Sequence, residues 1–284
     1  LDADLYLLRA NIFRSMGKND AVIGEAVAVA AADPNNSYFQ IVAARIYDAS
    51  GQRDEALKAV DRALAIKPEA YIYLNRADLR APDDLAGQKA DLASGMRLDP
   101  TDDRLIVRSA RLEGKMGNLL GGIAMLNRAL ASSKAGQSLL LMERGILYAK
   151  SGNGALADRD FAAVRAKTTT SMELNNICWT KAIAGVALES ALVDCNLALT
   201  KTPDSAAALD SRGFVFLRLG RIDDAIRDYD AALAKQPTQT ASLFGRGIAW
   251  LRKGDKAKGE ADLAAARNIS PNIDRTFADY GVKP

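Results

Sequence analysis

A period of 34 residues constrains the fold of this chain more than any other feature of its sequence. Three prolines, Pro203, Pro237 and Pro271, lie at that interval. Other positions recur at the same interval, which pairs Leu209 with Leu243, Arg212 with Arg246, Gly213 with Gly247 and Phe216 with Trp250. Two periods before the first residue of each pair stand Leu141, Arg144, Gly145 and Tyr148. A fixed period of this length predicts an array of stacked units, each of which repeats one supersecondary structure.

Each unit has the pattern of a helix, a turn and a second helix. In one unit, Leu209, Gly213 and Phe216 fall at i, i+4 and i+7, which places them on one face of a helix. Gly220 follows where that helix should end, because glycine adopts a left-handed conformation at little cost. Pro237 then stops the second helix. The sequence therefore predicts a chain of helical hairpins.

The repeat pattern extends over nearly the whole chain, and we predict one continuous solenoid over residues 1–284. Its last residues, 274–284, are expected to form a short capping helix, because Ile273, Phe277 and Tyr280 make an apolar stripe there. The approximate units are 3–36, 37–69, 70–102, 103–137, 138–170, 171–205, 206–239 and 240–273.

A 34-residue helical hairpin with small residues at the helix contacts, an aromatic residue in each helix and a closing proline resembles the tetratricopeptide repeat. The resemblance implies an all-α, right-handed superhelical solenoid of about eight hairpins with a C-terminal capping helix. Such hairpins cannot bury their apolar faces alone, so neighbours stack on one another. The resemblance also implies that the first helices line a concave surface. The second, fifth, sixth, ninth and twelfth positions of each repeat would face a ligand there.

Composition excludes several kinds of site. The chain has no histidine and two cysteines, which removes imidazole catalysis, histidine metal ligands and a four-cysteine zinc site. We therefore predict no catalytic residues, no metal and no cofactor, and we expect that the chain is not an enzyme. A net charge of +3 without a basic stripe argues against nucleic acid as a partner. No apolar run of about eighteen residues is present, so membrane insertion is not expected.

Arginines in the fourth unit form the first candidate binding site. Arg104, Arg108 and Arg111 are spaced i, i+4 and i+7, on one helical face. Arg45 and Asn75 hold comparable positions in the two preceding units. Several guanidinium groups together suit carboxylates, so the predicted ligand is a protein or peptide with acidic residues.

The same arginines have a simpler interpretation. They can form a solvated basic face that pairs with the neighbouring acidic residues Asp102, Asp103 and Glu113.

The sixth unit holds the second candidate. Asn175, Asn176 and Trp179 could hold an extended peptide by hydrogen bonding and stacking, or Trp179 could be a packing residue between units. Cys178 and Cys195 lie in the two helices of the same hairpin. They would form a disulfide in an oxidising compartment and remain small buried apolar residues in a cytosol.

Two functions remain open. The favoured one is a binding scaffold that takes a protein or peptide on its concave face. In the alternative, the chain is the non-catalytic C-terminal arm of a larger bacterial enzyme. The run from Leu174 to Trp179, followed by Ala191 to Cys195, resembles repeat regions of proteobacterial proteins, some of which carry a transglutaminase-like domain.

The start at Leu1 suggests a fragment or processed product. Together with the cysteine pair it favours a periplasmic or exported location over the cytoplasm. The sequence assigns neither the partner nor the oligomeric state.

Overall fold

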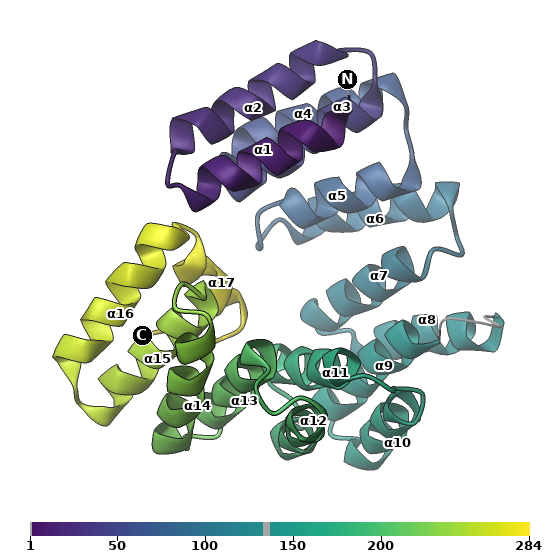
Figure 1. The fold of residues 1–284 in the computed structure, drawn as a ribbon. Helices are drawn as coiled ribbons and strands as arrows, with labels where there is room; N and C mark the ends of the chain where they lie inside the picture. Colours follow the sequence, from purple (N-terminus) through teal and green to yellow (C-terminus); the bar gives the residue numbers. More distant parts are fainter. Residues whose placement is uncertain (1, 133–136) are drawn as a thin grey trace. The chain divides into compact units, whose positions relative to one another are not determined.

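The computed structural model describes residues 2–132 and 137–284 and forms only helices in these ranges. Consecutive helices run as hairpins along the chain (Figure 1). They are α1 (Ala3–Ser15), α2 (Asn19–Ala32), α3 (Ser37–Ala49), α4 (Arg53–Ile66), α5 (Ala70–Leu79), α6 (Leu85–Leu98), α7 (Asp103–Lys115), α8 (Leu119–Ser132), α9 (Ser138–Lys150), α10 (Gly154–Arg165), α11 (Ser171–Ala184), α12 (Leu188–Lys201), α13 (Ala206–Arg218), α14 (Ile222–Lys235), α15 (Thr240–Lys253), α16 (Lys256–Ile269) and α17 (Ile273–Asp279).

The all-α class and the hairpin pattern are confirmed by these helices. Each of the predicted repeats contains one helix pair, and α17 begins next to the predicted capping segment. The chain divides into two compact units, residues 1–140 (unit 1) and 141–284 (unit 2), with the boundary inside α9. The number of repeats, the hand of the superhelix and the single continuous solenoid stay predictions.

The periodic prolines and glycines lie where the helices end. The helices α12, α14 and α16 end two residues before Pro203, Pro237 and Pro271, respectively. A residue that precedes proline is driven out of the α conformation, which fixes this end. The helix α13, the first helix of the predicted repeat 206–239, is followed by Gly220. The φ of Gly220 is 74°, which lies in the left-handed region that glycine tolerates.

Glycines at the contact between the two helices of a hairpin bring the backbones close together. A Cβ atom added at Gly145 would lie 2.6 Å from the ring of Phe161, and one at Gly213 would lie 3.1 Å from the ring of Tyr229. Both rings are buried, so neither can move into solvent. The large side chain of the second helix therefore occupies the space that the glycine leaves empty.

Within residues 2–132 and 137–284, an arginine on the first helix joins the two helices in five of the hairpins. It donates to a carboxylate that lies 15 or 16 residues later, on the second helix. The pairs are Arg9 and Glu25, Arg76 and Asp91, Arg144 and Asp160, Arg212 and Asp228, and Arg246 and Asp262. In unit 2, for example, both Arg212 and Arg246 donate two hydrogen bonds to their carboxylates, the fork geometry that suits guanidinium.

Some of these arginines also reach the preceding hairpin. Arg246 donates to Asp230 on α14 at 2.7 Å, and Arg212 donates to Asn196 on α12 at 2.9 Å. One side chain therefore links its own hairpin and fixes that hairpin against its neighbour. The hydrogen bonds to Asp228 raise the pKa of Arg212 above its ordinary value, so the guanidinium keeps its charge in this partly buried place.

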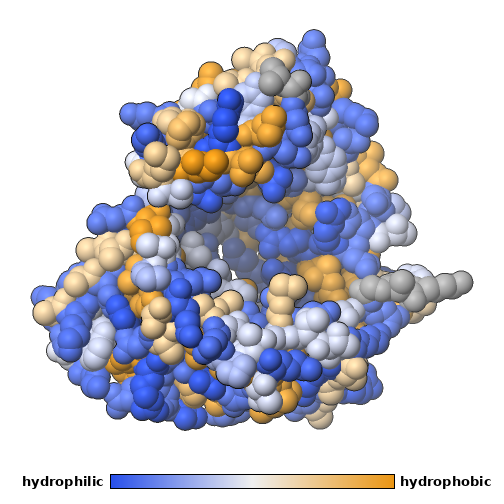
Figure 2. Space-filling view, in the orientation of Figure 1, coloured by the Kyte–Doolittle hydropathy of each residue, from blue (hydrophilic) through white to orange (hydrophobic). Residues whose placement is uncertain are grey.

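The outer face of α1 carries apolar side chains that have no cover in the described part of the chain. Leu5 and Ile12 are 51% and 49% exposed. The matching residues of α3, Phe39 and Ile46, are buried where α3 packs on α2. Figure 2 shows apolar side chains gathered where Figure 1 places α1. This face of α1 therefore has the composition of a stacking face.

We expect Gly145→Ala to destabilise the protein, because the added methyl group meets the buried ring of Phe161. The loss of unfolding free energy should be about 1–3 kcal/mol, the usual cost of overpacking. Gly24→Ala is the matched control, since Gly24 lies inside α2 with open space around its Cα. It should stabilise by about 0.5–1 kcal/mol through helix propensity. Urea denaturation of both variants checks the pair, and equal effects would contradict the packing argument.

Candidate functional site

The predicted ligand positions of unit 1 form a polar row on neighbouring first helices. The ninth positions of the first four repeats hold Asn11 on α1, Arg45 on α3, Asp78 on α5 and Arg111 on α7. All four are exposed. Asp78 pairs with Arg108 of α7, and the row as a whole faces solvent.

The predicted arginine cluster of α7 is partly neutralised by ion pairs. Arg104 contacts Asp102 at 2.6 Å and holds the pKa of that carboxyl below its usual value. Arg108 pairs with Asp78 on α5, while Arg111 lies exposed on the same helix. The pairing interpretation is therefore realised for Asp102, whereas the binding of an acidic ligand by these arginines stays a prediction.

The other two predicted residues of unit 1 differ in their surroundings. The Asn75 side chain is half-buried, and its amide donates to the backbone carbonyl of Tyr71 at 2.7 Å, within α5. Arg45 is exposed, and no described carboxylate forms an ion pair with it. Arg45 therefore presents an uncompensated guanidinium on α3.

The same ninth positions are apolar in unit 2. Ile146, Phe214 and Ile248 are buried there, and Trp179 is half-buried. This change from a polar to an apolar row is visible in the sequence. It indicates that the two units do not use their first helices in the same way.

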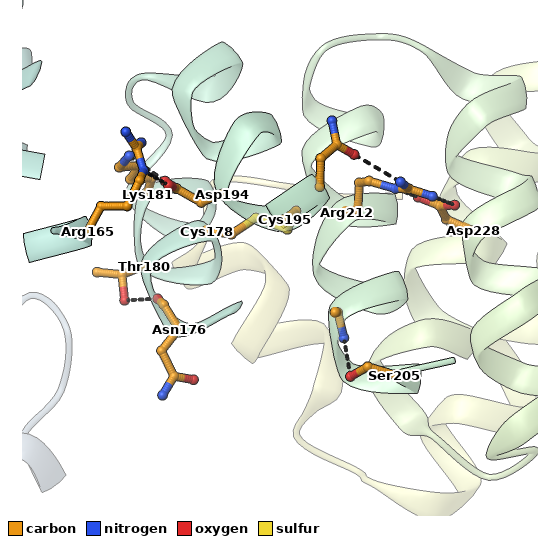
Figure 3. The surroundings of a disulfide bond; sticks show 12 residues. Arg165, Asn176, Cys178, Thr180, Lys181, Asp194, Cys195, Ser205, Arg212 and Asp228 are labelled. Carbon is orange, nitrogen blue, oxygen red and sulfur yellow. Dashed lines mark hydrogen bonds and ion pairs between the residues drawn. A yellow bond between two sulfur atoms is a disulfide. The ribbon is translucent and has the colours of Figure 1, made fainter. Parts of the chain in front are cut away.

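The predicted site of the sixth repeat is only partly exposed. Asn176 is exposed, and its backbone carbonyl accepts from Thr180 at 2.7 Å (Figure 3). The side-chain oxygen of Asn175 is buried without a hydrogen-bond partner. The Trp179 ring packs against Phe214, with the two ring centres 5.3 Å apart. Packing is thus one established role of Trp179, and peptide binding by the two amides stays a prediction.

An aromatic patch in unit 2 consists of Trp179, Phe214 and Phe244, one from each of α11, α13 and α15. All three occupy predicted ligand positions of their repeats. The patch is covered by α17 and the residue after it. Phe277 lies 4.7 Å from Phe244 between ring centres, and Tyr280 lies 5.5 Å from Trp179 in an edge-to-face contact. Sequence analysis identified the stripe of α17 but not the patch that it covers.

A buried carboxyl group lies near the patch. Asp210 on α13 is 7% exposed and accepts a hydrogen bond from Ser242 on α15 at 2.5 Å. Burial raises the pKa of Asp210 to about 6. Burial, and then the charge of Asp210, also raises the pKa of the Tyr229 phenol well above its ordinary value. Asp210 is thus the group of this region whose protonation changes in the ordinary range of pH.

The two cysteines are joined. Figure 3 shows the disulfide between Cys178 on α11 and Cys195 on α12, whose Cα atoms lie 5.4 Å apart. Both residues are buried. This hairpin has Ile177 where five others carry the arginine, but it keeps the acid as Asp194, so the disulfide links helices that lack the usual arginine.

A second link in this hairpin is a buried ion pair. Lys181 is fully buried, and its ammonium group contacts Asp194 at 2.6 Å and donates to Ser190 at 2.9 Å. Figure 3 shows Arg165 from α10 pointing at the same carboxylate. Burial lowers the pKa of Lys181, against the attraction of Asp194. A buried charge of this kind is stable only while its partner is present.

No group of three or more histidine, cysteine, aspartate or glutamate residues within 2–132 and 137–284 could hold a metal ion. In those ranges no helix has the length and apolar character needed to cross a bilayer. A cavity of about 380 Å³ in unit 1 is lined by Met96, Ile106, Met125 and the side chains around them, with Asp103 and Arg128 as its charged residues.

Comparison with known proteins identifies the repeats. Family models described as tetratricopeptide repeat match residues 38–70 and 212–272. Among solved structures, a tetratricopeptide repeat protein from Parabacteroides merdae ATCC 43184 aligns over 86% of this chain and 97% of its own, with a TM-score of 0.52 and 15% identity. Yeast Tom70 aligns over 93% of this chain and 58% of its own, with a TM-score of 0.62 and 10% identity. At these identities the likeness shows the fold.

No curated protein matches the sequence. The expected association with a transglutaminase-like domain and the proteobacterial source stay predictions.

We expect Asp210→Asn to remove a pH dependence of stability. The folded protein holds the Asp210 proton up to about pH 6, against a reference pKa of 3.8. The contribution of this carboxyl to the free energy of unfolding is therefore complete at low pH and is lost as the pH rises through 6. From pH 4 to pH 8 the wild type should lose about 2–3 kcal/mol of unfolding free energy relative to the variant. Urea denaturation at both pH values measures this difference, and parallel pH profiles would contradict it.

We expect the double variant Cys178→Ala, Cys195→Ala to be less stable than the oxidised wild type. Loss of the cross-link frees the unfolded chain and should cost about 2–4 kcal/mol. A reductant serves as the control: it should destabilise the wild type by a similar amount and leave the variant unchanged. Unfolding curves with and without dithiothreitol provide the measurement. A wild type whose stability does not depend on reduction would contradict the role of the disulfide.

Proposed function

Because this chain is a tetratricopeptide-repeat protein, we propose that it is a scaffold that binds another protein or a peptide on the concave, first-helix face of its repeats. Stacked hairpins provide an extended surface of side chains from successive first helices. An extended peptide can contact several of them at once. The partner is a macromolecule under this proposal, and the chain holds it without changing it chemically.

The observation that carries the proposal is the polar row of unit 1. Asn11, Arg45, Asp78 and Arg111 repeat at one position of successive hairpins, and each side chain is exposed. Packing of the stack accounts for the apolar residues of the same helices, and the row stays exposed to solvent although Asp78 pairs with Arg108. Polar side chains at regular intervals can hydrogen bond to the backbone and charged groups of an extended peptide.

The charge of the row supports an acidic ligand. Asp78 is already paired with Arg108, which leaves Arg45 as a guanidinium without a carboxylate among the described residues. Guanidinium groups bind carboxylates in a bidentate geometry that is stronger than a neutral hydrogen bond. We therefore assign the anchoring of an acidic side chain to Arg45.

The side chains of this surface also favour binding over catalysis. They are amides, guanidinium groups and one paired carboxylate, in a chain without histidine. Groups of this kind orient and hold a ligand by hydrogen bonds.

We also infer that the protein works in an oxidising compartment. The support is the buried disulfide of the α11–α12 hairpin, since cytosolic thiols are kept reduced.

A selection of peptides on the folded chain tests the scaffold proposal. A displayed library of random twelve-residue peptides is enriched on the wild type, and the affinities of the selected peptides are then measured by fluorescence anisotropy. Selected peptides should be rich in aspartate and glutamate. Arg45→Glu should weaken their binding at least tenfold, about 1.4 kcal/mol, because it replaces an attraction by a repulsion.

The matched control is Arg97→Glu, which reverses the same charge on the exposed side of a second helix, α6. It should leave the affinity unchanged. Equal weakening by both variants would indicate a general charge effect and would contradict the assignment of Arg45. Enrichment of no peptide at all would remove the support for a peptide-binding surface in unit 1.

A further inference from the structure

The end of the described chain lies on predicted ligand positions of its own repeats. Trp179 and Phe214 are ninth-position residues, and Phe244 is a fifth-position residue. Phe277 contacts Phe214 and Phe244, with ring centres 5.6 and 4.7 Å apart. The aromatic patch of unit 2 is therefore occupied at the positions where the proposed function expects a ligand.

The segment that covers the patch has the form of a ligand helix. Its apolar residues Ile273, Phe277 and Val282 are buried, while Arg275 and Asp279 on the other side are exposed. An amphipathic helix that places its apolar face on a receiving surface is a recurring mode of peptide recognition.

Polar contacts at the segment are few. Arg218 on α13 donates to the backbone carbonyl of Tyr280 at 2.6 Å and to that of Ala182 at 3.1 Å. No described carboxylate pairs with Arg218. Arg267 and Asp274 form the other link, an exposed ion pair of the kind that contributes little. The carbonyl acceptor at Tyr280 can be replaced by a carbonyl or a carboxylate of another segment.

The length of α17 makes its order dependent on the patch. It spans seven residues, and an isolated helix of that length is not stable in water. Only the turn at Ser270–Asn272 separates it from α16, so the effective concentration of the segment at the patch is high. A competing helix must overcome that concentration before it can bind.

We propose that residues 273–282 are an intramolecular ligand that closes the aromatic patch of unit 2 to other helices. The inference rests on the proposed function, because it takes the first-helix surface as the place of binding. The partner class that follows is an amphipathic helix with aromatic residues at the spacing of Phe277 and Tyr280. Such a helix binds when the segment is released.

A peptide added to the full chain tests the proposal. The probe is a fluorescent peptide of residues 271–284, and its binding is followed by anisotropy. The wild type should bind it weakly, since the patch is occupied. Phe277→Asp should bind the same peptide at least tenfold more tightly, because a charge on the buried face of α17 releases the segment. The control Asp279→Ala, which changes an exposed residue of α17, should behave as the wild type does.

Two results would overturn the proposal. One is that the wild type and Phe277→Asp bind the peptide with equal affinity. The other is that Phe277→Asp keeps its helical circular dichroism but does not bind the peptide. Specificity is checked with a peptide that itself carries Phe277→Asp, which should bind to neither protein. The test uses the chain's own segment and unit 2, whereas the scaffold test uses foreign peptides and unit 1. Either can therefore fail without the other.

A second arrangement covers the case in which Phe277→Asp does not fold. A protease site is inserted between Ser270 and Pro271, and the protein is cut after folding. The severed segment should stay bound at high concentration, leave on dilution and be replaced by the labelled peptide. Unfolding of the repeats when the segment leaves would show that it is a permanent part of the fold and would overturn the proposal.

Discussion

An ion pair between the two helices of a hairpin recurs through the structure and gives the stack its register. The arginine lies on the first helix and the acid on the second, as in Arg212 and Asp228, and the carboxylate is nearly buried in most of the pairs. A buried carboxylate is costly without a partner, so the two helices are held where the pair can form. Because Arg246 and Arg212 also bond to the hairpin before them, the same interaction sets the contact between neighbours.

In the hairpin of α11 and α12, other interactions hold the two helices together. It lacks the arginine but keeps the acid as Asp194, which pairs with Lys181 of the same hairpin, and the disulfide adds a covalent link between the helices. This hairpin also supplies Trp179 to the aromatic patch. A repeat that departs from the common pattern thus keeps its two helices together through other local links.

The two units make different use of the same positions. In unit 1 the ninth positions are polar and exposed, and this surface is the one that we propose for an acidic peptide. In unit 2 they are apolar and covered in part by α17. One repeat architecture therefore provides an open polar surface and a closed aromatic one. The closed surface is stabilised by aromatic contacts and by burial of apolar area, which an incoming helix would have to replace.

The sequence by itself determined the all-α class, the hairpins and most of their ends, because a 34-residue period, Gly220 and the spaced prolines act locally on the backbone. It also placed Arg45 and the arginines of α7 on their helices. Only the tertiary structure decided which charges are already paired, as with Arg108 and Asp78, since partners 30 residues apart meet through stacking. Likewise, the stripe of α17 was readable from the sequence, but its contact with Trp179 depends on how the chain returns over its own repeats, a long-range arrangement that no local pattern encodes.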